Sequence, residues 1–174
     1  MTFALYATIW LALAAFVAGE AGKQRRTNPR RLWSISLVGA VLCVVHIVIA
    51  LGHHHHWDHG AAVRETARQT ATVYGVAWGG GVHVNYVLMA VWLAELWRWR
   101  MRPAEYFARS PTVLWGLRAF FLIIIVNAAV VFASPRTRIA GAVLTVALLL
   151  IWADGSGSAG QSKRPSPTTV GDAL

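Results

Sequence analysis

Two histidines lie inside long apolar stretches of the sequence, where their side chains are suited to chemistry within a membrane. His46 belongs to residues 32–52, and His83 belongs to residues 73–97. Neutral imidazole nitrogens are axial ligands of haem b, which two membrane helices can hold between them when each contributes one histidine. We therefore expect His46 and His83 to bind haem b, or another tetrapyrrole, at a similar depth in the membrane.

Several neighbours of these histidines fit a flat macrocycle. Gly79 and Gly80 precede His83 by four and three positions in the expected helix, so no side chain would lie beneath its imidazole. Glycine inside a helix costs about 1 kcal/mol relative to alanine, which indicates that something needs the space. Tyr86 follows on the same side and can donate a hydrogen bond to a ligand or a quinone ring. Asn127, on another apolar segment, is expected at a similar depth.

A second cluster lies between the apolar segments and points to metal chemistry. Imidazoles bind zinc, copper and nickel, and a thiolate at Cys43, three residues before His46, would suit copper. A metal-handling protein is therefore an alternative, in which an outer loop captures the ion and Cys43, His46 and His83 receive it. A flexible polar loop that binds no metal is also open, because adjacent histidines cannot all face one ion on a regular backbone. The loop cluster consists of His53, His54, His55, His56, Asp58 and His59.

Composition identifies the elements that must position these residues. Of the 174 residues, 56% are hydrophobic and only 13% are charged, and the mean hydropathy is +0.50. A soluble domain carries about 25% charged residues, and a helix needs about 20 apolar residues to cross a bilayer. The sequence therefore predicts an all-α integral membrane bundle over residues 1–153. Its expected helices are residues 3–19, 32–52, 73–97, 113–133 and 139–153.

The first segment, the last segment and the tail of the chain each have distinct features. The first segment is followed, not preceded, by basic residues, which is the reverse of a cleavable signal peptide, so we expect it to be retained. The sequence predicts five transmembrane helices. Because the last segment, residues 139–153, is short, the number falls to four if this segment is re-entrant. Residues 154–174 are rich in Gly, Ser and Pro and are expected to form a disordered cytoplasmic tail.

Basic residues between the segments predict the orientation. The four connections contain five, two, four and two Lys or Arg residues in turn. By the positive-inside rule the first and third connections are cytoplasmic, so the amino terminus and the histidine-rich loop lie outside. We expect a bacterial inner membrane. The same distribution argues against nucleic-acid binding, because the cations sit at the ends of apolar segments.

Other classes of function find little support. Cys43 is the only cysteine, which excludes a disulfide within the chain and a cysteine-based zinc or iron–sulfur site in the monomer. The sequence has neither a phosphate-binding glycine loop with its following lysine nor a nucleophile elbow. The connections are too short to hold a catalytic domain. The chain is therefore expected to be a subunit that carries electrons, metal or protons rather than an enzyme by itself.

The leading hypothesis is a redox subunit of a larger membrane complex. In outline, segments 32–52 and 73–97 resemble small membrane cytochromes b that pass electrons to quinone, although no family motif carries the likeness. In this hypothesis electrons pass between an extracytoplasmic partner and the quinone pool. A third alternative is a structural or assembly subunit without a ligand. In that case His46 and His83 would bond to Asn127, Thr145 or a backbone carbonyl and hold helices together.

Overall fold

The chain folds into helices joined by short connections over the residues that the structure, a computed structural model, describes: 2–25 and 28–161. The predicted all-α class is confirmed, since no strand occurs in these ranges. A π-helical turn, η1 (Asn127–Val131), extends α6. The helices are α1 (Thr2–Gln24), α2 (Pro29–His55), α3 (His59–Tyr74), α4 (Gly81–Met101), α5 (Pro103–Phe107), α6 (Pro111–Val126) and α7 (Pro135–Gln161).

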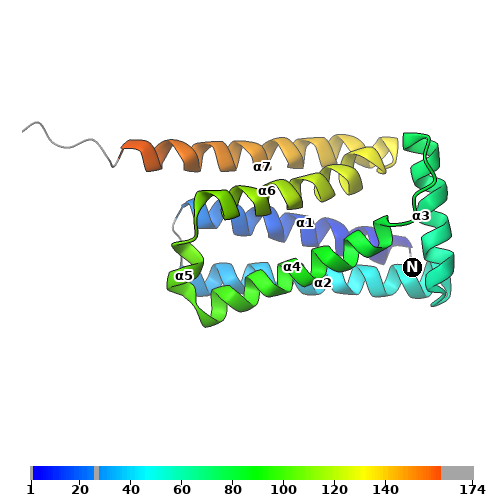
Figure 1. Ribbon diagram of the computed structural model, residues 1–174, viewed down its shortest axis with the longest axis horizontal. Coiled ribbons are helices and arrows are strands. Elements are labelled where there is room, and N and C mark those ends of the chain that lie inside the picture. Colours follow the sequence, from blue (N-terminus) through cyan, green and yellow to red (C-terminus); the bar gives the residue numbers. More distant parts are fainter. Residues whose placement is uncertain (1, 26–27, 162–174) are drawn as a thin grey trace, which may run out of the picture.

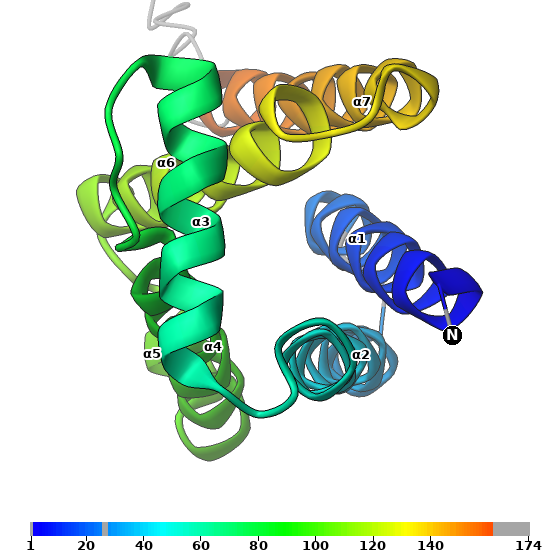
Figure 2. The same ribbon diagram turned by 90° about the vertical axis from the view of Figure 1, so that its right-hand side faces the viewer.

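Helices α1, α2, α4, α6 and α7 run alongside one another, and α3 and α5 mark the ends of the bundle. Figure 1 shows α3 lying across one end and α5 at the opposite end. Figure 2 looks at the α3 end, where α3 crosses in front of α4 and α6, α1 lies beside α2, and α6 lies beside α7. The most extensive helix contact joins α1 to α2. We refer below to the α3 end and the α5 end of the bundle.

Four of these helices are long and apolar enough to cross a membrane. They are residues Phe3–Gln24, Pro29–His55, Pro111–Val131 and Pro135–Asp154, and less than a third of each most apolar stretch is buried inside the molecule. Their remaining apolar side chains therefore face outward, as a lipid environment requires. The protein is an integral membrane protein. The fifth long helix, α4, is not among these four; it carries His83, Asn85 and Glu95.

The prediction of one continuous helix over residues 73–97 is wrong. Gly75 adopts a left-handed φ of 74° that ends α3, and α4 begins only at Gly81. The side chain of Thr70 holds the intervening segment. Its hydroxyl donates to the carbonyl oxygen of Trp78 at 2.8 Å and accepts from the Trp78 N–H at 3.0 Å. The first eight residues of the expected third crossing, 73–80, thus belong to the end of α3 and to this turn.

Other helix boundaries also differ from the sequence-based expectations. Helix α2 continues through His55, so the first part of the expected histidine loop is helical, and only His56 to Asp58 connect α2 to α3. Helix α7 begins at Pro135, so the last apolar segment is long enough to span and does not need a re-entrant path. The same helix continues to Gln161, and the expected tail is therefore helical over residues 154–161. Its remainder, residues 162–174, lies outside the described residues.

Small residues allow the helices to approach closely. A Cβ atom added to Gly39 on α2 would lie 3.2 Å from the Ala15 side chain on α1. One added to Gly141 on α7 would lie 1.9 Å from the carbonyl oxygen of Ala129 in η1. Small residues at contacts are typical of membrane bundles, where van der Waals packing rather than burial from water joins the helices.

Candidate functional site

Among the cavities that the described residues form, two lie between the helices of the bundle, one toward each end. The His46 cavity, toward the end where η1 meets α7, has a volume of about 310 Å³. The Arg118 cavity, toward α5, has a volume of about 200 Å³. Phe16, Trp92 and Phe121 line both of them. These three aromatic rings therefore form a partition between the two cavities.

The imidazole of His46 is held by the neighbouring helix. Its Nδ1 lies 3.0 Å from the carbonyl oxygen of Leu5 on α1 and 3.4 Å from the hydroxyl of Thr8. A carbonyl oxygen can only accept, so Nδ1 carries the hydrogen and donates to Leu5. In the neutral ring the lone pair then resides on Nε2. His46 is thereby fixed as a residue whose second nitrogen can accept a proton or bind a metal.

The His46 cavity is mostly apolar and aromatic. Its walls come from α1, α2, α4, α6 with η1, and the start of α7. Asn85 on α4 is a polar residue of the wall, and Ser134 and Thr137 bring hydroxyl groups from the α7 end of the cavity. Cys43 also lines it, three residues before His46 on α2. The aromatic side chains in the wall are Tyr6, Trp10, Phe16, Trp92, Phe121 and Phe132.

His83, the expected second ligand, does not line this cavity. It stands near the start of α4 with its ring edge-to-face against His59, at 5.5 Å between ring centroids. Tyr86 stacks on His59 at 5.8 Å, and its hydroxyl lies 3.2 Å from His59 Nδ1. The structure therefore places His83 and Tyr86 in a cluster with His59 of α3, apart from the cavity that contains His46.

The glycines before His83 serve the turn between α3 and α4. A Cβ atom on Gly79 would lie 2.6 Å from the carbonyl oxygen of Val63, and one on Gly80 would lie 2.3 Å from the Trp78 indole. Residues of the chain itself thus occupy the space for which the sequence suggested a macrocycle. The glycines allow the backbone to pass close to α3.

Asn127 lies at the start of η1 and is half-buried. Its side-chain oxygen accepts from the Tyr74 hydroxyl at 2.5 Å, and its nitrogen donates to the carbonyl oxygen of Ile123 at 2.8 Å. It links the end of α3 to α6 and does not line the His46 cavity. Thr145 is buried but donates to Gly141 of its own helix at 2.8 Å. Neither side chain therefore bonds to His46, whose hydroxyl neighbour is Thr8 at 3.4 Å.

The histidine-rich segment forms no metal-binding arrangement. Among the described residues, no three His, Cys, Asp or Glu side chains are placed to hold a metal ion. His53, His54 and His55 follow one another around the last turn of α2, and His56 has a left-handed φ of 48°. Metal binding by this segment therefore stays a prediction.

Asp58 has a structural role at the start of α3. Its carboxylate accepts the N–H of Ala61 at 3.0 Å and lies 3.3 Å from Arg64. This is the bond of an N-cap, which satisfies a free amide of the first helical turn. The hydrogen bond from Ala61 and the positive charge of Arg64 lower the pKa of Asp58 below its ordinary value.

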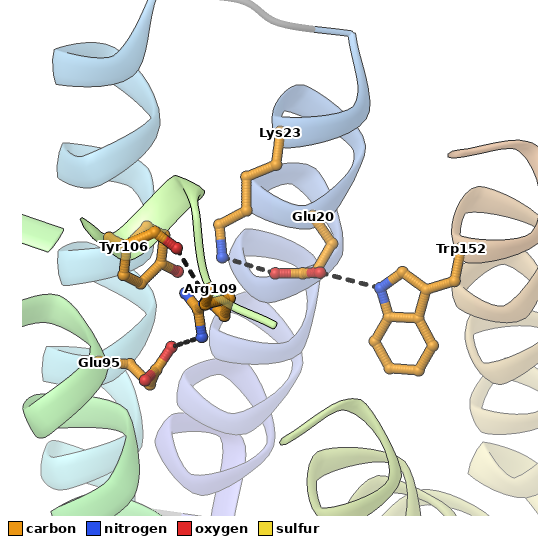
Figure 3. A network of polar contacts seen from close by, with 6 residues as sticks. All are labelled: Glu20, Lys23, Glu95, Tyr106, Arg109 and Trp152. Atoms are coloured by element: carbon orange, nitrogen blue, oxygen red, sulfur yellow. Dashed lines mark hydrogen bonds and ion pairs between the residues drawn. The ribbon is translucent and has the colours of Figure 1, made fainter. Parts of the chain in front are cut away.

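The Arg118 cavity contains a polar network that joins three parts of the bundle. Lys23 donates to Glu20 at 2.7 Å, and the indole N–H of Trp152 on α7 donates to the other carboxylate oxygen of Glu20 at 2.9 Å (Figure 3). Beside it, Arg109 donates to Glu95 of α4 at 2.5 Å (Figure 3). All five side chains belong to the α5 half of the molecule, and all line this cavity.

Arg118 lies in the middle of α6 and completes this cavity. Its guanidinium carbon lies 4.9 Å from the centre of the Trp115 ring and 5.3 Å from that of Trp152, as in cation–π contacts. The side chain is buried, and its Nε has no hydrogen-bond partner among the described residues. Arg118, Glu20 and Lys23 are not among the functional residues expected from the sequence. The signal was a charged residue within a long apolar run, which is costly and therefore informative.

Comparisons with known protein families, curated proteins and solved structures found no match to this chain. Its function has to be inferred from the two cavities.

Proposed function

We propose that the protein is a small membrane subunit that holds haem b in the His46 cavity and passes electrons between an extracytoplasmic partner and quinone. The observation that carries this proposal is the position of His46 in the wall of a cavity of about 310 Å³, with its Nδ1 bonded to the Leu5 carbonyl at 3.0 Å. Metal-ligating histidines almost always donate their other ring N–H to such a group, which fixes the ring and leaves Nε2 for the metal. In this proposal His46 Nε2 would bind the iron of the haem.

The surroundings of His46 support a large apolar ligand. The wall is rich in aromatic rings and in alanines, and Ser134 and Thr137 offer hydroxyl groups to acidic substituents such as propionates. A volume of about 310 Å³ falls within the range of roughly 300–1,000 Å³ for small-molecule sites. Because His83 is outside this wall, the chain supplies one histidine ligand here. The group, when bound, carries one electron at a time; the residues hold it and exclude water.

An absorption spectrum with a rescue step tests this proposal. The protein is purified in detergent from cells supplied with a haem precursor, and oxidised and dithionite-reduced spectra are recorded. We expect a Soret band that is lost in His46→Gly and restored when imidazole is added to that variant. His83→Ala is the matched control and should keep the band. A featureless spectrum of folded, haem-supplied protein, or a band that persists in His46→Gly, would overturn the proposal.

A second candidate is binding of a quinol, favoured by the presence of Asn85 in the same wall. The Nε2 lone pair of His46 can accept a quinol O–H, and the Asn85 amide can bond a second ring oxygen. Organic extraction of purified protein distinguishes the two candidates. A quinone recovered in stoichiometric amount from protein without a Soret band, and lost in Asn85→Leu, would favour this alternative.

A further inference from the structure

The Arg118 cavity has an excess of positive charge. Two of its three cations are paired with carboxylates: Lys23 with Glu20 at 2.7 Å, and Arg109 with Glu95 at 2.5 Å. Arg118 forms no ion pair with the described residues, and its Nε donates to none of them. Glu20 also acts electrostatically on Arg118, but the charged side chains that line this cavity still sum to one net positive charge.

The position of Arg118 makes this imbalance costly. Its side chain is 9% exposed, and it lies seven residues into α6, about 10 Å from the start of the helix at 1.5 Å per residue. Charged side chains within a membrane are expensive unless an opposite charge or polar partners accompany them. Ring faces of Trp115 and Trp152 give the guanidinium partial compensation. They do not satisfy its N–H groups, which lie in the plane of the guanidinium.

From these observations we infer that the Arg118 cavity binds a phosphate group, with Arg118 as its principal ligand. A guanidinium presents parallel N–H donors that match two oxygens of a phosphate. A phosphate held by two such hydrogen bonds would neutralise the excess positive charge of the cavity. The cavity, about 200 Å³, has room for such a group. Lys23, Gln24 and Ser36 in the wall add donors near it. The phosphate can belong to a phospholipid headgroup or to a free ion, since the chemistry is the same.

Two binding measurements distinguish these sources. Protein is freed of lipid in a maltoside detergent and kept in phosphate-free buffer. In the first, inorganic phosphate is titrated into the protein in a calorimeter. In the second, phosphatidylglycerol is added, and bound lipid is counted by native mass spectrometry. We expect one equivalent to bind in at least one measurement. Binding of inorganic phosphate identifies a site for the free ion, and binding of the lipid alone identifies a headgroup site.

Arg118→Gln is the decisive variant, and Arg100→Gln is its matched control. Arg100 lies toward the α5 end of α4 and is exposed, and it does not line the cavity. We expect affinity to fall at least tenfold in Arg118→Gln and to change less than twofold in Arg100→Gln. If Arg118→Gln does not fold, Arg118→Lys keeps the charge without the guanidinium donors and should still lose affinity at least threefold. Absence of binding in both measurements, or equal affinity in the Arg118 and Arg100 variants, would overturn the inference. The result does not depend on whether His46 binds haem.

Discussion

The rings of Phe16 and Trp92 meet edge to face, with centroids 5.3 Å apart and planes at 81°. Phe121 completes the group at 5.0 Å from Phe16 and 5.9 Å from Trp92. Aromatic pairs in such geometries contribute about 0.5–1.5 kcal/mol beyond the burial of their surface. Because each ring lines both cavities, this partition also decides whether a group bound in one cavity has direct access to the other.

Removing one ring from the partition should destabilise the bundle and join the cavities. Phe16→Ala deletes a buried ring at the contact of α1, α4 and α6, and such deletions cost about 3–5 kcal/mol. Reversible unfolding in mixed detergent measures this loss. Phe3→Ala is the control, because Phe3 lies on the same helix and is 85% exposed. Equal stability of the two variants would show that the partition does not hold the helices together.

The contact between α7 and η1 should not tolerate a side chain at Gly141. A methyl group there would lie 1.9 Å from the Ala129 carbonyl oxygen, so the two helices would have to separate. Overpacking of this kind costs about 1–3 kcal/mol. Gly116→Ala on α6 is the matched control, since nothing lies within 4 Å of its added methyl group. Thermal unfolding of both variants in one detergent checks the difference; a Gly141→Ala protein as stable as Gly116→Ala would contradict it.

Hydropathy was sufficient to predict the membrane bundle but not the corner between α3 and α4. Apolar residues on both sides of the Gly79–Gly80 pair give residues 73–97 the average composition of a crossing. The backbone instead turns at Gly75, where φ is 74°, and packs against Val63. The repeated glycines indicate a possible break in the helix, because each disfavours a helix by about 1 kcal/mol. Whether these glycines form a turn depends on how the segment packs against α3. The sequence of residues 73–97 alone does not reveal that packing.

For the candidate sites too, the sequence predicts the residue type and its depth, whereas only the fold reveals which residues are in contact. Sequence spacing identified His46 as an intramembrane ligand candidate, and the structure gives it a bond to Leu5 that supports this role. The depth of His83 could be estimated from its segment, but its direction could not, because helix rotation is set by neighbours. Arg118 was visible in the sequence as a charge in an apolar run. What makes it informative is the pairing of Glu20 and Glu95 with other cations, which only the fold reveals.

Acid should loosen the first turn of α3. The pKa of Asp58 is lowered by the N–H of Ala61 and by Arg64, so its stabilising contribution is fully present above the ordinary pKa of an aspartate. That contribution is lost as the pH falls through the lowered pKa of the folded protein. Asp58→Asn keeps an N-cap but does not titrate. Circular dichroism or amide signals of the α3 turn should therefore change below about pH 4 in the wild type. The same change in Asp58→Asn would contradict this assignment.

Glu20 should be far more important for stability than an exposed glutamate in a similar pair. Glu20→Gln leaves Lys23 without its carboxylate partner in a cavity that already has a net positive charge, and breaking a buried pair costs about 3–5 kcal/mol. Glu105→Gln is the control, because Glu105 and its partner Arg102 are both exposed, and such pairs contribute about 0–1 kcal/mol. Both changes remove one negative charge and alter the side-chain volume equally, so the comparison isolates burial.

Unfolding is measured for both variants in phosphate-free detergent and again with saturating phosphate. If phosphate occupies the Arg118 cavity, it should restore more stability to Glu20→Gln than to Glu105→Gln, because the first variant has the larger excess of positive charge to neutralise. Equal losses of stability without phosphate would show that the Lys23–Glu20 pair is solvated in the membrane-embedded protein.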